Sequence, residues 1–139
     1  MSAVEFFARR KRDVITSVPG VSDGTANQLI ADLPELGRLG RQRIAKLVGV
    51  APLADDSGPR KGARHIRGGR RPVRNALYMA AFNAMRFCDR FRRIADDMRQ
   101  RGKAFKVIVT ACMRKLLVTL NQMVKTGTVY NASINVPIG

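Results

Sequence analysis

The chain has 139 residues, a length that fits one domain better than two. Hydrophobic residues make up 45% of it, which is enough for a modest core and argues against a disordered chain, and no uncharged apolar run reaches the roughly 18 residues of a membrane span. With 26 Lys and Arg against 10 Asp and Glu, the formal net charge is +16. This excess predicts a polyanionic partner, with a nucleic-acid backbone favoured over a membrane surface.

The start of the chain and its two cysteines indicate the compartment. Residues 1–12 run from apolar to basic, the reverse of a secretory signal, so we expect a cytoplasmic protein. Cys88 and Cys112 lie in separate helical patterns, which favours two buried thiols over a disulfide or a zinc site.

Short helices are expected in the first third, interrupted at Pro19-Gly20 and at Pro34. Residues 14–33 resemble a helix-hairpin-helix, in which the backbone N–H groups at the start of the second helix bind a phosphate. Gly20 would make that contact. The second glycine of the motif is replaced by Ser22, so a turn that only packs against the rest of the fold is an equally good interpretation.

Helical periodicity is lost over residues 51–71, where glycines and prolines interrupt the chain. Residues 60–74 contain seven Lys and Arg residues and no carboxylate. We expect no acidic side chain of the chain to neutralise them. Such a single-signed, glycine-spaced segment can follow a phosphate backbone. The predicted contacts to DNA or RNA are Arg60, Lys61, Arg64, Arg67, Gly69, Arg70, Arg71 and Arg74.

Three longer helices are expected from residue 72 onward, which makes the fold all-α. Pro72 suits the first turn of a helix, and Gly102 and Gly127 suit helix ends. Apolar residues recur at helical spacing in three groups: Val73, Leu77, Ala80, Ala81, Ala84 and Cys88; Phe91, Ile94, Ala95 and Met98; and Ile108, Val109, Cys112, Leu116, Leu120 and Met123. We expect these faces to form the core of a cluster over residues 72–125. The tail, residues 126–139, fits a frayed end or a short strand.

Several motifs, taken together and in order, resemble the C-terminal domain of insertion-sequence family 110 transposases, the group also named with 116 and 902. They are residues 47–52 (LVGVAP), 56–58 (DSG), 62–70 (GARHIRGGR), 73–81 (VRNALYMAA), 101–103 (RGK) and 111–117 (ACMRKLL). The resemblance implies a domain over residues 14–125, with residues 1–13 as the remnant of a preceding helix. It also implies a role in DNA transposition.

In that family the serine of the Ser-Gly motif attacks a DNA phosphodiester and forms a covalent phosphoserine, and the matching residue here is Ser57. A serine hydroxyl needs activation, and no convincing base is visible, although nearby arginines supply positive charge. On the residues alone, Asp56-Ser57-Gly58 is also ordinary turn chemistry. Tyr78 fits a structural role better than a nucleophilic one, and the lone His65 lacks a partner for catalysis or metal binding.

The resemblance further implies an N-terminal RuvC-like domain whose carboxylates bind magnesium, a guiding bridge RNA and assembly into a homo-oligomer. These 139 residues lack such a domain, so no cofactor is expected in this chain, and we expect a truncated or partial reading frame. Asp55 and Asp56 fit a turn better than a magnesium site. The alternative is a non-catalytic helix-hairpin-helix module that binds nucleic acid.

Overall fold

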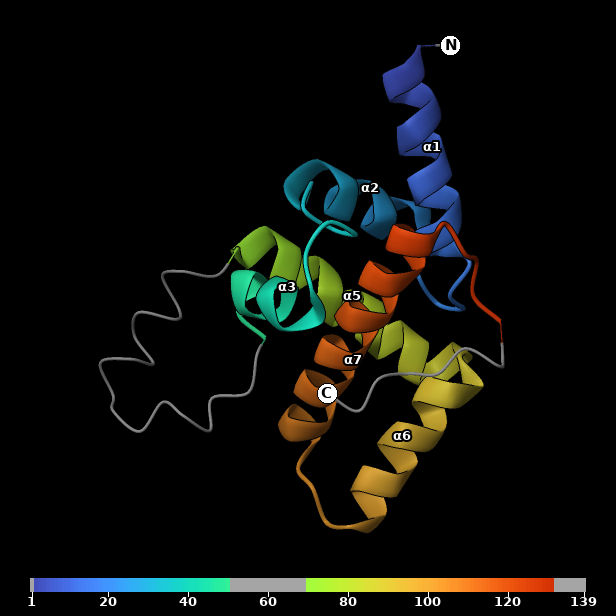
Figure 1. Ribbon diagram of the computed structural model, residues 1–139. Coiled ribbons are helices and arrows are strands. Elements are labelled where there is room, and N and C mark those ends of the chain that lie inside the picture. Colours follow the sequence, from blue (N-terminus) through green and yellow to red (C-terminus); the bar gives the residue numbers. More distant parts are fainter. Residues whose placement is uncertain (1, 51–69, 132–139) are drawn as a thin grey trace, which may run out of the picture.

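The computed structural model describes residues 2–50 and 70–131 of the chain. These residues form helices and no strand, which confirms the predicted all-α fold (Figure 1). The helices are α1 (Ala3–Thr16), α2 (Asp23–Asp32), α3 (Arg41–Val48), α5 (Arg71–Phe87), α6 (Asp89–Gln100) and α7 (Phe105–Thr126). All three helices predicted after residue 72 are present, and α7 ends at Gly127 as expected.

Helix α7 is the central element of the fold. It packs against α5, α6, α3 and α1, and Figure 1 shows it running through the middle of the molecule. Its predicted apolar face is fully buried from Ile108 to Met123. By length and composition α7 is apolar enough to cross a membrane, but 61% of the relevant window is buried inside the protein. The helix is therefore accounted for as the core of the domain.

A buried asparagine on α7 fixes the connection between α2 and α3. The Asn121 side chain is 2% exposed, and its Oδ1 accepts a hydrogen bond from the Gly37 N–H at 2.6 Å. Its Nδ2 donates to the Leu39 carbonyl at 2.9 Å. Because a buried amide is costly without partners, these two bonds explain how a polar residue is accommodated in the core. They hold the chain that leads into α3 against α7.

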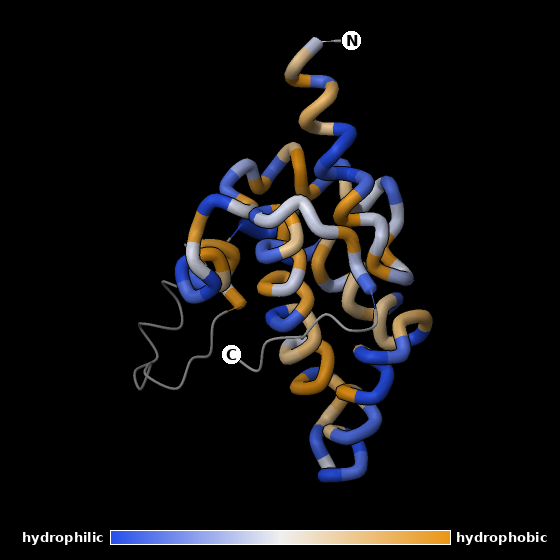
Figure 2. Tube along the Cα trace, turned by 45° about the vertical axis from the view of Figure 1, so that its right-hand side comes forward, coloured by the Kyte–Doolittle hydropathy of each residue, from blue (hydrophilic) through white to orange (hydrophobic). Residues whose placement is uncertain are grey.

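The apolar residues gather between the helices and α6 carries most of its polar residues outward, whereas the projecting start of α1 is largely apolar (Figure 2). Helix α1 projects from the body at its N-terminal end (Figure 1). Its first turns leave Val4, Phe6 and Phe7 exposed, whereas Val14 and Ile15 near its end are buried. Only the C-terminal part of α1 therefore contributes to the core. The helix runs without a break through residues 13 and 14.

The chain after α7 packs back on the domain as far as it is described. Residues 128–131 form no strand, and the Tyr130 N–H donates to Ser17 Oγ at 2.8 Å. Cys88 Sγ donates to Tyr130 Oη at 3.2 Å. Burial and this contact with Cys88 raise the pKa of Tyr130 to about 12, so its phenol stays protonated at neutral pH. Cys88 and Cys112 are both buried, as predicted.

Candidate nucleic-acid interface

The structure describes only some of the predicted site residues. Gly20, Arg70, Arg71 and Arg74 are described. The candidate residues of the segment 51–69 lie outside the described part of the chain: Asp55, Asp56, Ser57, Arg60, Lys61, Arg64, His65, Arg67 and Gly69. The described part of the candidate interface therefore consists of the residues that flank this segment.

Arg70 forms an ion pair with Glu35 of the same chain. The expectation that no group within the chain neutralises the cations of residues 60–74 is therefore wrong for Arg70. Its Nη1 and Nη2 donate to Oε1 and Oε2 of Glu35, each at 2.6 Å, and Nη1 also donates to the Asp32 carbonyl at 3.1 Å. The planar fork of the guanidinium matches the carboxylate in a bidentate pair. The hydrogen bonds from Arg70 hold the pKa of Glu35 below its usual 4.5. The pair joins the α2–α3 connection to the start of α5.

The next two cations differ in how far they are available to a partner. Arg71 is exposed in the first turn of α5. Arg74 is half-buried, and its Nη1 donates to the Val48 carbonyl at the end of α3 at 3.4 Å. Arg71 is therefore the described cation of this segment that is best placed for a phosphate.

Gly20 is explained by packing. Its φ is +97°, a conformation that L side chains rarely adopt. A Cβ at this position would lie 2.8 Å from the carbonyl carbon and oxygen of Asn83 and 2.9 Å from the nitrogen of Ala84, all backbone atoms of α5. The turn between α1 and α2 is thus pressed against α5. The predicted helix-hairpin-helix and its phosphate contact remain predictions, but this geometry favours the packing interpretation.

The start of α2 already has its own cap. Ser22 is the N-cap residue, and its Oγ accepts a hydrogen bond from the Thr25 N–H at 3.2 Å. Asp23 places a carboxylate in the first turn, where it interacts favourably with the helix dipole. The same carboxylate would repel a phosphate. Ser22, which replaces the second glycine of the helix-hairpin-helix motif, therefore accepts the Thr25 N–H hydrogen bond that a bound phosphate would otherwise accept.

Helix α6 carries cations that are paired with its own carboxylates. Arg92 pairs with Asp89, Arg99 with Asp96 at 2.7 Å, and Arg101 with Asp97 at 3.0 Å. All of these side chains are largely exposed. Pairs of this kind three or four residues apart stabilise a solvated helix weakly.

A second group of cations lies where α3 and the connection before it meet α7 and α1. Its members are Lys11, Arg38, Arg41 and Arg114. They come from three separate segments of the sequence: Lys11 from the basic residues 9–12, Arg38 and Arg41 from the start of α3 and the residues before it, and Arg114 from α7. Sequence analysis did not identify them as a group, because only the fold brings these segments together. The ion pairs found in the described ranges include none of them. They are the cations from which the further inference below is argued.

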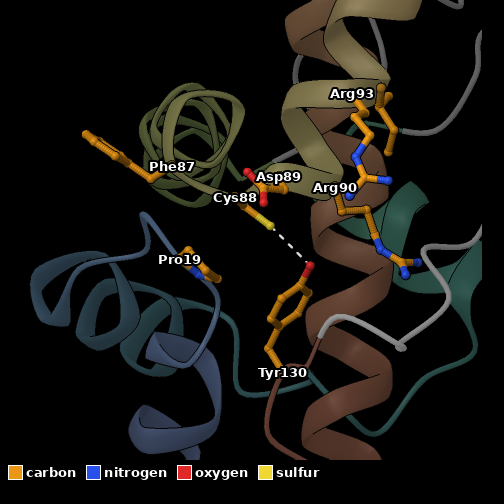
Figure 3. Close-up of a pocket in the computed structure, with 8 residues that line it drawn as sticks. Pro19, Phe87, Cys88, Asp89, Arg90, Arg93 and Tyr130 are labelled. Atoms are coloured by element: carbon orange, nitrogen blue, oxygen red, sulfur yellow. Dashed lines mark hydrogen bonds between the residues drawn. The ribbon is translucent and has the colours of Figure 1, made fainter.

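A cavity of about 460 Å³ opens beside the end of α5 (Figure 3). Pro19, Cys88 and Tyr130 line one side of it, and Arg90 and Arg93 of α6 line the other. The Cys88–Tyr130 contact crosses this space. Because the Tyr130 phenol stays protonated, it is not an activated nucleophile at neutral pH.

Two predicted side-chain roles can be compared with the described residues. Tyr78 stacks on Phe82 with ring centroids 6.4 Å apart, which agrees with the structural role preferred for it. Among the residues that the structure describes, no three His, Cys, Asp or Glu side chains come together as a metal site requires.

Comparison with known proteins identifies the family of this helical domain. The sequence model described as "Transposase IS116/IS110/IS902 family" matches residues 12–96. The chain is also 30% identical, over 121 residues, to the "Insertion element IS110 uncharacterized 43.6 kDa protein" of Streptomyces coelicolor. That alignment covers 86% of this chain and 30% of the relative, so the chain spans about a third of the relative's length. The chain belongs to the IS116/IS110/IS902 transposase family.

Proposed function

We propose that this chain is a DNA-binding domain of a transposase, that it carries the serine nucleophile of DNA strand exchange, and that it acts in the cytoplasm. The observation that carries the proposal is the family match, which includes both Ser57 and the cations that follow it. The net charge of +16 and the exposed Arg71 support binding to a phosphate backbone.

The proposed chemistry is a phosphoryl transfer to the Ser57 hydroxyl. The bond from Ser57 Oγ to phosphorus forms, and one bond from phosphorus to a deoxyribose oxygen breaks. The serine loses its proton and the departing sugar oxygen gains one, so the number of bonds and protons is unchanged. The covalent link retains the energy of the phosphodiester for the rejoining step. Cations around the reacting phosphate would stabilise the charge that develops on its oxygens.

The partners of this reaction are also proposals. We assign any magnesium to the N-terminal RuvC-like domain that the family resemblance implies. A guide RNA would use the same phosphate-binding cations as DNA. Assembly into a homo-oligomer is supported by the projecting start of α1, where Phe6 and Phe7 are exposed. Without the other parts, we expect these 139 residues to bind DNA but not to cleave it.

The covalent step is tested by trapping the phosphoserine. The chain is joined to the N-terminal domain of a family member, supplied with bridge RNA and magnesium, and mixed with DNA that carries a suicide nick. We expect a covalent protein–DNA adduct at Ser57 in the wild type, and none in Ser57→Ala, which should bind DNA equally well. Tyr78→Phe, which removes only a hydroxyl, is the matched control and should form the adduct normally.

An adduct with Ser57→Ala would place the nucleophile elsewhere. Normal DNA binding without an adduct in the wild type would favour the alternative, a non-catalytic nucleic-acid-binding module. Binding itself is measured as a function of salt. With Arg70 held by Glu35, six cations of the segment remain, and six phosphate contacts give a log–log slope of about −5. An affinity that does not depend on salt would contradict the proposed DNA binding.

A further inference from the structure

The cations at the junction of α3 and α7 are brought together by the packing of the fold. Arg38 lies in the connection that Asn121 holds against α7, and Arg41 begins α3, which packs directly on α7. Arg114 lies on α7, and Lys11 lies on α1, which also contacts α7. Helix α3 and helix α7 lie side by side in Figure 1. Lys11 lies near Arg38, Arg114 lies near Arg41, and Arg38 and Arg41 are three residues apart, so the four cations form one group, named here the α3–α7 cation surface.

These cations repel one another. The pKa of Arg114 is lowered by burial and then by the charge of Arg41. The pKa of Lys11 is lowered by burial and then by the charge of Arg38. In each case the burial and the like charge disfavour the protonated form, and the ion pairs of the described residues supply no carboxylate to compensate. The folded protein therefore holds positive charges together at an energetic cost.

Arg114 also has an unsatisfied donor. Its Nε is buried and has no hydrogen-bond partner. A buried donor without a partner is energetically costly. When such a donor occurs in a folded protein, a bound water, ion or ligand is a common explanation. The apolar spacing of α7 does not require an arginine at this position. Arg114 as a whole is only half-buried, so an anion supplied from outside that contacts its guanidinium would offset the surrounding charge.

The start of α3 adds donors to the same surface. Its N-cap residue is Gly40, which is exposed and makes no side-chain capping hydrogen bond. No carboxylate lies in the first turn, and a Cβ at Gly40 would meet nothing within 4 Å. The backbone N–H groups that open a helix need an acceptor, and here neither a cap nor an acidic residue provides one. The start of α3 is therefore open at Gly40, next to Arg41.

Building on the proposed function, we infer that the α3–α7 cation surface is a second binding site for the phosphate backbone of a nucleic acid. One phosphate is held by Arg41, Arg114 and the first N–H groups of α3. A neighbouring phosphate of the same strand is held by Arg38 and Lys11. Both duplex DNA and a guide RNA present this chemistry, and the experiment distinguishes them. The residues of this site are different from Ser57 and from the cations of residues 60–74.

The test compares two double variants with the same change in charge. Arg41→Gln with Arg114→Gln removes the proposed phosphate contacts. Arg99→Gln with Arg101→Gln removes two cations that α6 already pairs with its own carboxylates. Affinity is measured against salt concentration for a mixed-sequence DNA duplex and a single-stranded RNA of about 20 nucleotides, long enough to span several contacts. We expect the first variant to flatten the slope by about two, and the second to change it by less than about half a unit.

Inorganic phosphate provides a readout that a purely structural role would not produce. At matched ionic strength, phosphate in place of chloride should raise the Tm of the wild type and of the α6 variant. It should raise the Tm of the Arg41/Arg114 variant less. Without phosphate, this variant should be at least as stable as the wild type, because repulsion has been removed. If it does not fold, Arg41→Gln alone serves, since Arg41 is exposed, and a slope change of about one is expected.

The outcomes separate the two proposals. Loss of slope on DNA alone assigns the surface to DNA, loss on RNA alone assigns it to RNA, and either result supports the inference. A wild-type slope and affinity on both probes in the Arg41/Arg114 variant overturns it. In that case, weaker nucleic-acid binding by the double variant Arg64→Gln/Arg67→Gln would still support the proposed function. A wild-type chain that binds neither probe would overturn the inference and the proposed function together.

Discussion

Two helices of this domain begin directly after a turn and could each receive a phosphate, yet they differ in every feature that matters for binding. Helix α2 follows the Pro19-Gly20 turn, is capped by Ser22 and has Asp23 in its first turn. Helix α3 follows Gly40, has no side-chain cap, and begins with Arg41. Ser22 accepts a hydrogen bond from one backbone N–H at the start of α2, whereas no side chain caps the start of α3.

The comparison teaches that a motif and a binding site are separable in this fold. The helix-hairpin-helix pattern draws attention to Gly20, but that glycine is required by the close approach of α5. No pattern in the sequence points to Gly40, although the helix start there is open and cationic. Capping and neighbouring charge decide which helix start accepts an anion.

Gly20→Ala should have the largest effect on stability. The positive φ and the contact with the Asn83 and Ala84 backbone together should lower the free energy of unfolding by about 2–4 kcal/mol. Chemical denaturation measures this directly. Gly24→Ala is the matched control, because its Cβ would meet only Ser22 Oγ at 3.9 Å, and it should raise stability by about 0.5–1 kcal/mol. A neutral Gly20→Ala that loses DNA affinity would instead favour phosphate contact at the turn.

Ser22→Ala should have a smaller effect, because it removes one capping hydrogen bond. We expect a loss of about 1 kcal/mol in the free energy of unfolding, since the Thr25 N–H loses its acceptor. Ser2→Ala is the control. Ser2 caps α1 through the Glu5 N–H, but the start of α1 projects from the body, so its loss should affect global unfolding less. Nucleic-acid affinity should be unchanged in both, and a selective loss of affinity in Ser22→Ala would show that α2 touches a phosphate.

The helices of this fold were predictable because their signals are local. The faces that contain Leu77, Ile108 and Leu116 are buried as the 3.6-residue period requires. Ile44 and Val48 of the short helix before Gly49 are buried as well. The role of Asn121 was not predictable, because its two partners lie 82 and 84 residues away in the sequence. Local periodicity carries no information about such contacts.

The candidate site was predictable only in part, for the same reason. The charge run located Arg71, but the carboxylate that neutralises Arg70 lies 35 residues away at Glu35. The α3–α7 cation surface could not be predicted from the sequence, because Arg41 and Arg114 come close only when α3 packs on α7. The role of Ser57 stays a prediction, as the residue lies outside the described ranges.

Glu35→Gln tests the connection that lies between the two helix starts. Arg70 lowers the pKa of Glu35 in the folded protein, so the pair contributes stability above the usual pKa of 4.5 and loses it as the pH falls through the lower, folded-state value. The Tm difference between the wild type and Glu35→Gln should therefore be positive at pH 7 and shrink below about pH 4.5. Asp96→Asn, in an exposed pair on α6, is the control. A difference that does not depend on pH would contradict this assignment.

Gly40→Asp gives the start of α3 a side-chain cap and a carboxylate, as at the start of α2. Of the variants described here it should change stability least, and it should remove the difference in phosphate binding between the two helix starts. An Asp at the N-cap supplies the missing acceptor and a favourable charge at the helix start, so stability should rise by a few tenths of a kcal/mol to about 1 kcal/mol. The added carboxylate occupies the space beside Arg41 and repels a phosphate. Nucleic-acid affinity should therefore fall although the fold is more stable, which a damaged structure would not produce. Gly40→Asn adds a cap without the charge and should weaken binding less than Gly40→Asp. If both variants bind as tightly as the wild type, the open start of α3 is not where the phosphate lies, and the difference between the two helix starts has no consequence for binding.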